Sequence, residues 1–206
     1  MMKNREIEAK VLLTSNIYQK IITSFPVKAD FKQENYYFET TNDTLKKHDI
    51  SLRIRIYEDH AEQTMKVPDP NPVQKDFHEV VELTDKLALN EAQARVKAGL
   101  NHQTLPFNGV IGDYLKERLS LSSTQLDIFT WSKTRRILLK GPKNCELTLD
   151  QTYYPDGYCD YELEIENTDP QLIQEVKLEL EHKFAFSDNH NNQNQSKIAR
   201  AAIHRK

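Results

Sequence analysis

The stretch EIEAK at residues 6–10 alternates charged with apolar side chains, and three later segments do the same. They are LRIRI at 52–56, TMKV at 64–67 and ELEIE at 162–166. Because a β-strand sends successive side chains to opposite faces, each segment has one apolar face and one charged face. Carboxylates beside guanidinium and ammonium groups are what a site needs to hold a metal ion and a polyphosphate together.

One such strand alone indicates no function, since a half-buried strand normally shows polar side chains to water. Exposed strand positions usually carry a loose mixture of Thr, Lys, Gln and Tyr. Here the charges come instead as Glu-x-Glu-x-Lys, Arg-x-Arg and Glu-x-Glu-x-Glu. The segments also lie near both ends of the chain, so a fold that joins them builds one large site.

The composition narrows the classes of protein. The chain has 206 residues, which suits one domain over residues 1–206, and 29% of its residues are charged. Its formal net charge of −3 gives no overall bias toward nucleic acid or membranes. No apolar run approaches the length of a membrane span, so we expect a cytoplasmic protein. Neither the two cysteines nor the seven histidines have the spacing of zinc ligands.

Alternation, helix caps and turn residues together predict an α+β protein with a mostly antiparallel sheet. The predicted strands cover residues 4–13, 33–40, 51–57, 62–67, 76–83, 128–139, 145–154 and 160–166. The predicted helices cover residues 17–25, 91–99, 109–119, 170–184 and 196–204.

One hairpin places several acids on a common face. Residues 155–157 form a good three-residue turn with Gly157 at the left-handed position. This register sets Asp150 opposite Glu162, Thr148 opposite Glu164, and Glu146 opposite Glu166. Like charges directly opposite each other destabilise a sheet. We therefore expect water, metal ions or the basic side chains of other strands to neutralise them.

These residues resemble a known family. Residues 6–10 resemble the ExExK signature of the CYTH family, also called triphosphate tunnel metalloenzymes. Residues 35–40, Leu45 and residues 52–55 resemble its "YFDT … L … LRIR" block, and segments at 64–66, 133–135, 149–150 and 162–166 follow in the expected order. The likeness spans nearly the whole chain and is strongest to the stand-alone bacterial YjbK-like group.

The resemblance implies a closed eight-stranded antiparallel β-barrel with helices packed outside. The barrel interior would be a polar tunnel that binds a triphosphate and a divalent metal. The apolar strand faces would point outward beneath the helices; they carry Ile7, Ala9, Ile54, Ile56, Met65, Leu163 and Ile165.

The same resemblance assigns roles to individual residues. The expected ligands of Mg²⁺ or Mn²⁺ are Glu6, Glu8, Glu164, Glu166 and Asp150. The expected phosphate-binding residues are Lys10, Arg53, Arg55, Lys66, Lys133 and Arg135. Catalytic roles fall to Glu6, Glu8, Lys10 and Lys66. Glu82 and Glu162 are expected to support the metal and its waters.

The helix over residues 196–204 has two open interpretations. In the first, it closes one tunnel mouth, and Lys197 or Arg200 reaches the phosphates. In the second, it packs on the outside of the barrel.

Four positions depart from the family pattern. Thr148 stands where relatives often have an acid, His78 where arginine is expected, Val80 where glutamate is expected, and Glu39 where aspartate is usual. The number of metals and the substrate preference are therefore left open.

The resemblance points first to a metal-dependent triphosphatase that removes the terminal phosphate of a linear triphosphate. The substrate would be a small molecule, inorganic tripolyphosphate or an organic triphosphate, with no nucleic-acid or membrane partner. Two alternatives are a class IV-type adenylate cyclase and a non-catalytic sensor of polyphosphate or nucleotides.

Overall fold

The computed structural model describes residues 2–70, 78–103, 106–121, 126–187 and 195–205, without the side chains of residues 2–6 and 78–79. The strands are β1 (Met2–Leu13), β2 (Val27–Thr40), β3 (Ser51–Ile56), β4 (Ala61–Pro68), β5 (His78–Leu87), β6 (Leu126–Lys140), β7 (Glu146–Tyr153) and β8 (Cys159–Glu166). The helices are α1 (Ser15–Ser24), α2 (Thr44–Lys47), α3 (Leu89–Leu100), α4 (Gly109–Leu119), α5 (Pro170–Phe184) and α6 (Lys197–Ile203), with a 3₁₀ turn at Pro142–Asn144.

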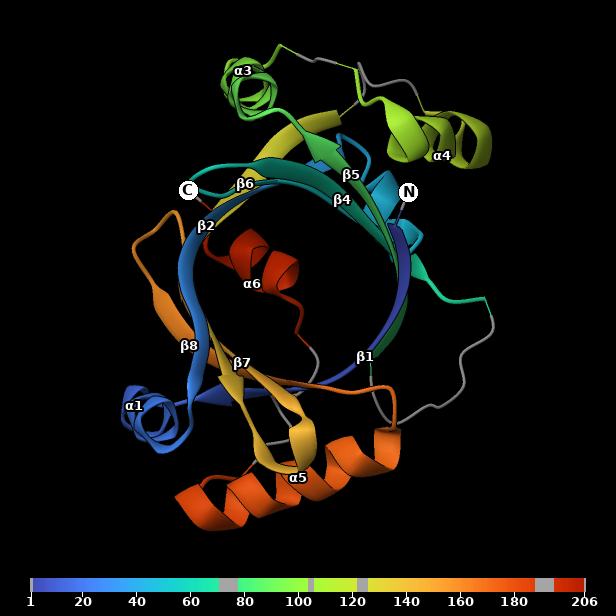
Figure 1. The fold of residues 1–206 in the computed structure, drawn as a ribbon. Helices are drawn as coiled ribbons and strands as arrows, with labels where there is room; N and C mark the ends of the chain where they lie inside the picture. The colour runs from blue at the N-terminus through green and yellow to red at the C-terminus, as the bar shows by residue number, and fades with distance from the viewer. Residues whose placement is uncertain (1, 71–77, 104–105, 122–125, 188–194, 206) are drawn as a thin grey trace.

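The eight strands form one antiparallel sheet that closes into a barrel, in the order β1-β5-β4-β3-β2-β6-β7-β8 (Figure 1). Closure depends on β1, whose first half pairs with β5 and whose second half pairs with β8. Glu8 is the residue where the two pairings meet, opposite His78 on one side and Glu166 on the other. The α+β class and the eight antiparallel strands agree with the sequence-based prediction.

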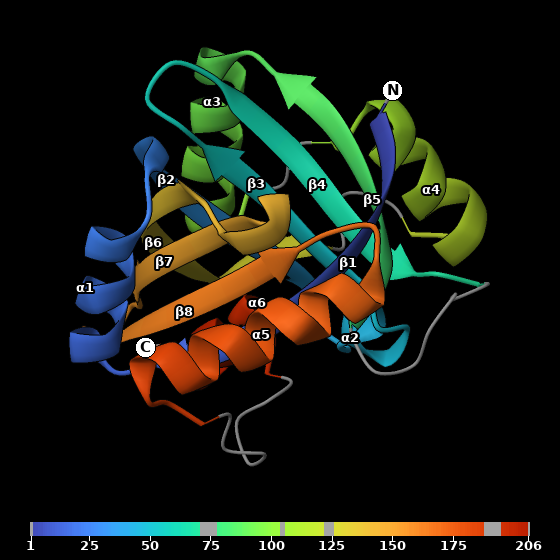
Figure 2. The same ribbon diagram turned by 60° about the horizontal axis from the view of Figure 1, so that its bottom comes forward.

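The apolar faces of the strands point outward and are covered by helices, as expected. On one side, α1 and α5 cover β1, β7 and β8, and this cluster includes Tyr18, Ile173, Leu163 and Ile165. On the other side, α2, α3 and α4 cover the strands around β3 and β4 (Figure 2). Burying each strand's apolar face under a helix turns its charged face inward.

Local signals explain where the helices begin. The Thr14 hydroxyl accepts a hydrogen bond from the N–H of Ile17 at 3.3 Å, and the Asp169 carboxylate accepts one from Gln171 at 2.9 Å. Pro170 follows that cap at the first helical position, where its missing N–H costs nothing. Helix α3 begins at Leu89, earlier than its predicted start at Glu91.

Two strands extend furthest beyond their predicted bounds. β2 begins at Val27 instead of residue 33, because it pairs with β6 along almost its entire length. β5 continues to Leu87, since β4 offers a partner as far as Ala61. The predicted start of β5 at residues 76–77 lies outside the described residues.

The β7–β8 hairpin has the predicted register. Asp150 pairs with Glu162, and Thr148 pairs with Glu164. The Tyr154 N–H donates to the Tyr158 carbonyl at 3.0 Å, and Gly157 has a φ of +92°. This positive φ is the reason the turn uses glycine.

Helix α6 lies within the ring of strands and not outside it (Figure 1). The carbonyl of Ala201 accepts a hydrogen bond of 2.7 Å from the buried Thr130 hydroxyl on β6. Across the described ranges, every helix is too short or too polar to span a membrane.

Candidate functional site

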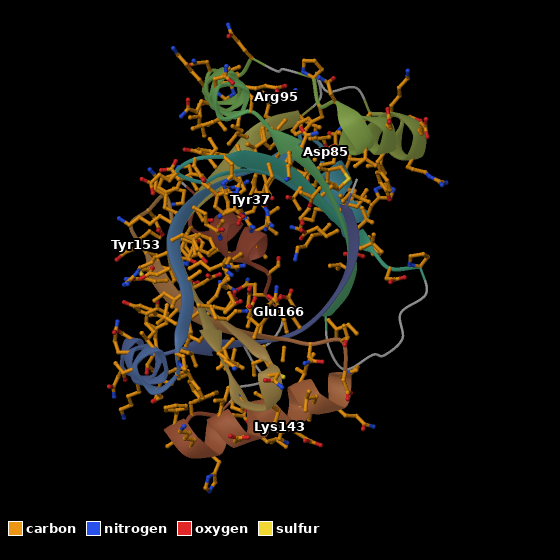
Figure 3. The ribbon with its side chains drawn as sticks, viewed as in Figure 1. Tyr37, Asp85, Arg95, Lys143, Tyr153 and Glu166 are labelled. Carbon is orange, nitrogen blue, oxygen red and sulfur yellow. The ribbon has the colours of Figure 1, made fainter. Side chains whose placement is uncertain are left out.

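The charged faces of the strands converge inside the barrel. The side chains that form ion pairs there include Glu8, Lys10, Arg53, Arg55, Lys66, Glu82, Arg136, Asp150, Glu162 and Glu164. Tyr37 and Glu166 also lie within the ring, whereas Tyr153 lies outside it (Figure 3). Residues from both ends of the sequence thus share one enclosed space.

One wall of the interior is mainly basic. Arg53 and Lys66 approach the same Glu82 oxygen at 3.9 and 3.5 Å. Arg55 donates to the Asn35 amide oxygen at 2.9 Å and lies 3.4 Å from Glu62. Burial and the neighbouring Arg55 charge lower the pKa of Arg53, although a guanidinium stays protonated at neutral pH. This concentration of positive charge is suited to a polyanion.

The opposite wall is acidic. Glu8, Glu164 and Glu166 each offer a carboxylate oxygen, and these oxygens lie within 4.8 Å of one another. The Lys10 ammonium is 2.7 Å from Glu8 and 3.9 Å from Glu164. Burial acts to lower the pKa of Lys10, but these carboxylates outweigh burial and raise it above its ordinary value. Lys66 also approaches Glu8, at 3.9 Å, so the two walls meet at this carboxylate.

A second carboxylate cluster adjoins the first. Asp150, Glu162 and Glu164 again place oxygens within 4.8 Å of one another, and Glu164 belongs to both clusters. Arg136 donates two hydrogen bonds, of 2.8 and 2.6 Å, to Asp150 and a third, of 2.9 Å, to Glu164. Lys197 from α6 lies 2.6 Å from Asp150 and 2.9 Å from Glu164, and it also contacts Glu162.

The cations of the second cluster hold most of its acids ionised. Burial acts to raise the pKa of Glu164, but Lys197 and Arg136 lower it well below its ordinary value. The same two cations lower the pKa of Asp150 against the effect of burial. Glu162 differs, because burial raises its pKa more than Lys197 and Arg200 lower it.

Two of the expected phosphate-binding residues lie elsewhere. Arg135 points to the outer face, where it pairs with Asp30 at 2.6 Å, and its side chain is 44% exposed. Lys133 shares that face and pairs with Glu34 at 2.8 Å. The structure corrects both assignments, and Arg136 takes the inward position. The pairing of Arg136 with Asp150 across β6 and β7 fixes this alternation, and it was not used in the sequence-based prediction.

The remaining positions of interest are placed as follows. The Glu6 backbone pairs with Val80 next to Glu8, but its side chain lies outside the described part of the structure. Thr148 is buried beside Glu164, and its hydroxyl has no hydrogen-bond partner among the described residues. The Glu39 carboxylate accepts from the N–H groups of Leu45 and Lys46 in α2.

The backbone of His78 pairs with Glu8, and its side chain is not described. Val80 is buried in β5, next to the position of Glu6. His78 and Val80 therefore both lie beside the acidic wall. The family pattern has arginine at the first of these positions and glutamate at the second.

The first carboxylate cluster fits a hard divalent cation. Mg²⁺ and Mn²⁺ prefer oxygen ligands and keep part of their coordination for water or phosphate. Glu8, Glu164 and Glu166 supply three such oxygens on neighbouring strands, with Lys66 close to Glu8 on the basic side. A cation held there would face the wall that suits phosphate.

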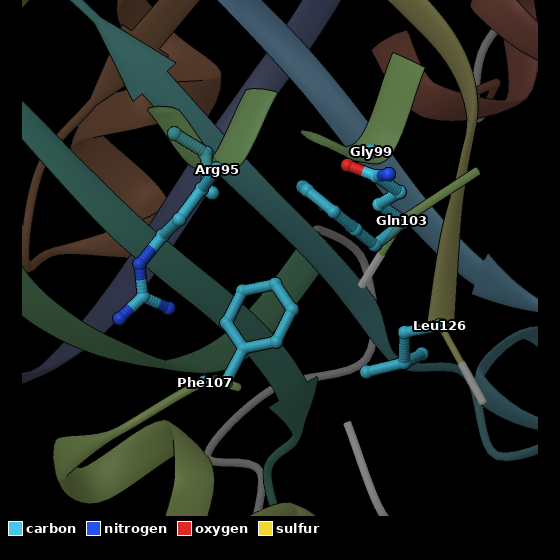
Figure 4. Close-up of a pocket in the computed structure, with 7 residues that line it drawn as sticks. Arg95, Gly99, Gln103, Phe107 and Leu126 are labelled. Carbon is cyan, nitrogen blue, oxygen red and sulfur yellow. The ribbon is translucent and has the colours of Figure 1, made fainter. Parts of the chain in front are cut away.

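A separate pocket lies outside the barrel, between α3 and the sheet (Figure 4). Arg95, Gly99 and Phe107 line it together with apolar strand residues. It offers about 10 Å³, which is the room needed by about one water molecule. The pocket is therefore too small to compete with the barrel interior as a ligand site.

Comparison with known proteins follows this geometry. A model of the CYTH domain matches residues 4–202, nearly the whole chain. The chain belongs to the CYTH domain family. Among curated proteins, no sequence matches this CYTH chain significantly.

Solved structures share the CYTH fold of this chain. A proposed adenylate cyclase from Bacillus halodurans is 28% identical, with 97% of this chain and 98% of the other covered and a TM-score of 0.80. A proposed adenylyl cyclase from Hippeastrum, described as having a dominant triphosphatase activity, is 20% identical, with 95% of each chain covered and a TM-score of 0.72. The protein PH1012 from Pyrococcus horikoshii is 14% identical, with 95% and 98% covered and a TM-score of 0.57.

Proposed function

We propose that this CYTH protein is a metal-dependent triphosphatase that releases the terminal phosphate of a linear triphosphate bound inside the barrel. The observation that carries the proposal is the meeting of the basic and acidic walls at Glu8, which Lys10 and Lys66 both approach. A triphosphate needs many cationic contacts, and its metal needs carboxylate oxygens beside them. The interior supplies both within one enclosed space.

The basic residues bind and orient the substrate. Arg53 and Arg55 offer guanidinium forks to phosphate oxygens, and Arg136 adds a third from β6. Lys10 and Lys66 contact the phosphate nearest the acidic wall as point charges. During transfer, negative charge spreads over the three equatorial oxygens, and fixed cations in a buried site stabilise that charge strongly.

Carboxylates hold the metal. Glu8, Glu164 and Glu166 are its ligands in this proposal, and Glu6 joins them from the same strand as Glu8. When bound, Mg²⁺ or Mn²⁺ supplies Lewis-acid polarisation of phosphate oxygens and a positioned water. In the reaction the water oxygen forms a bond to the terminal phosphorus, and the bond to the bridging oxygen breaks. The products are phosphate and the shortened polyphosphate.

A phosphate-release screen tests the proposal. It covers tripolyphosphate, pyrophosphate, ATP and thiamine triphosphate, each with Mg²⁺, Mn²⁺ and Ca²⁺. We expect release from at least one triphosphate with Mg²⁺ or Mn²⁺. Arg53→Ala and Glu8→Gln should each slow it by about 10²–10³-fold while far-UV circular dichroism stays unchanged. Unchanged turnover in both variants would refute the site.

Adenylate cyclase activity is the second candidate, favoured by the likeness to the proposed cyclase from Bacillus halodurans. That reaction requires the 3′ hydroxyl of ATP to attack its own α-phosphate. Product analysis with ATP separates the two reactions. Cyclic AMP with pyrophosphate indicates a cyclase, and ADP with phosphate indicates a triphosphatase.

A non-catalytic sensor is the third candidate, favoured by Thr148 and Val80 at positions where acids were expected. Calorimetry distinguishes it from an enzyme. Tight binding of tripolyphosphate without phosphate release under Mg²⁺ or Mn²⁺ would support the sensor.

A further inference from the structure

Helix α6 is fixed inside the barrel at several points. The Ser196 hydroxyl caps its first turn by accepting from Ala199 at 3.3 Å. Arg200 donates to Asp160 at 2.7 Å and to the Tyr154 hydroxyl at 3.1 Å. These contacts set the direction in which Lys197, at the first position of the helix, extends toward β7 and β8.

The ammonium of Lys197 lies among the oxygens of the second carboxylate cluster. It is 2.6 Å from Asp150 and 2.9 Å from Glu164, and it contacts Glu162 as well. Its side chain is 14% exposed, and its three carboxylate partners are 6% exposed or less. The ammonium therefore has the surroundings of a bound cation and not those of a surface lysine.

A divalent ion would need the same oxygens. Mg²⁺ binds oxygen ligands at about 2.0–2.1 Å and requires near-octahedral geometry. An ion in contact with Asp150, Glu162 and Glu164 would have to occupy the position of the ammonium, since all three oxygens face it. The ammonium and a divalent ion would also repel each other.

The first cluster has no such occupant on α6. Lys197 approaches Glu164, which the clusters share, but among the described residues it forms ion pairs with neither Glu8 nor Glu166. The local cation of the first cluster is Lys10, which lies 2.7 Å from Glu8 on the same strand. The two clusters thus differ in their contact with α6, because Lys197 contacts all three carboxylates of the second cluster but only the shared Glu164 of the first.

We propose that Lys197 is a built-in cation that takes the place of a second divalent ion, so that the substrate-free protein binds one metal ion, at Glu8, Glu164 and Glu166. Removing the ammonium opens a second ion site at Asp150, Glu162 and Glu164, with Glu164 shared between the ions. This inference rests on the metal site of the proposed function. It adds the number of metal ions that the protein binds.

Counting bound Mn²⁺ tests the inference without turnover. Electron paramagnetic resonance of free Mn²⁺ during titration of the substrate-free full-length protein gives the number of bound ions. We expect one ion for the wild type, two for Lys197→Met, and one for Lys197→Arg, which keeps the positive charge. Methionine keeps the length of the side chain while removing its charge.

Two further variants make the result specific. Adding Asp150→Asn to Lys197→Met should return the count from two to one, because Asp150 belongs to the second cluster alone. Glu8→Gln in the wild-type background should weaken binding of the single ion at least tenfold. Should Lys197→Met fail to fold, as judged by circular dichroism, the wild-type count still decides, since two ions there would overturn the inference.

The outcomes also separate this inference from the proposed function. One ion in Lys197→Met would overturn the inference even where the wild type hydrolyses triphosphate. The expected counts without any phosphate release would support the inference and refute the triphosphatase. No bound Mn²⁺ in the wild type would refute the metal site, and with it both proposals.

Discussion

At the scale of single residues, the face to which a side chain points decides its role. Arg135 and Arg136 are neighbours in the sequence, and nothing in their local composition distinguishes them. The sequence could predict a basic residue from β6 in the site, but not which one. That choice depends on the register with β7, where Arg136 pairs with Asp150. In contrast, alternation around Glu8, Arg53 and Glu164 is unambiguous, so it predicted that each shares a face with the other charged residues of its strand.

This pair offers a matched test of the barrel interior. Arg136→Ala should lower kcat/KM for the preferred triphosphate by about 10²–10³-fold, because it removes a buried cation from the proposed phosphate site. Arg135→Ala should change it by less than about threefold, since its partner Asp30 is on the exposed outer face. Initial-rate phosphate release measures both. Equal losses in the two variants would contradict the assignment.

At the scale of elements, α6 is the part of the fold that sequence patterns could not place. The sequence predicted a helix over residues 196–204, but a seven-residue helix fits inside or outside a barrel equally well. Its inner position depends on long-range partners. Near its end, His204 stacks on Tyr158 with ring centroids 4.0 Å apart, and its Nδ1 lies 2.7 Å from Asp156. The β7–β8 turn thus holds the end of the helix that carries Lys197.

His204→Ala should therefore loosen α6. The stack contributes about 0.5–1.5 kcal/mol, so without it the helix should open roughly 2- to 12-fold more often. Trypsin cleavage after Arg200, followed by mass spectrometry, measures this opening. His182→Ala, at an exposed position of α5, serves as the control. Equal cleavage rates in the two variants would show that the turn does not hold the helix.

At the scale of the whole molecule, the barrel is built around its charges instead of an apolar centre. Most apolar contacts lie between the sheet and the outer helices, in two clusters on opposite sides, and a small third cluster involves α6. The strand pattern left two possibilities, since the charged faces had to be either inside or solvated, and the family resemblance implied the first. Barrel closure itself came only from the family resemblance, because alternation says nothing about which strands meet at the seam. The interior charges then make stability depend on pH.

We expect stability to fall in acid. Glu164 and Asp150 have pKa values lowered from their ordinary values of 4.5 and 3.8, so unfolding takes up protons in this region. Their stabilisation is complete above about pH 4.5 and is lost as the pH falls through the lowered values. Glu162 has a raised pKa, so its own contribution to stability increases as the pH falls.

Thermal unfolding between pH 2.5 and 7 measures this dependence. The wild-type Tm should decrease steeply below about pH 4, where two lowered carboxylates outweigh one raised carboxylate. Glu164→Gln should show a shallower decrease, because it removes one of the two carboxylates with a lowered pKa. A Tm that decreases equally steeply in this variant would rule out Glu164 as a source of the effect.

The seam between β1 and β8 also has a consequence for biosynthesis. β1 is made first, and its second half must wait for residues 161–166, which are made more than a hundred residues later. On the ribosome, synthesis proceeds at about 5–20 residues per second, so this part of β1 stays without its neighbour for several seconds or longer. Such distant pairing also slows folding. The nascent chain consequently cannot assemble its Lys10–Glu164 contact until residue 164 has been made.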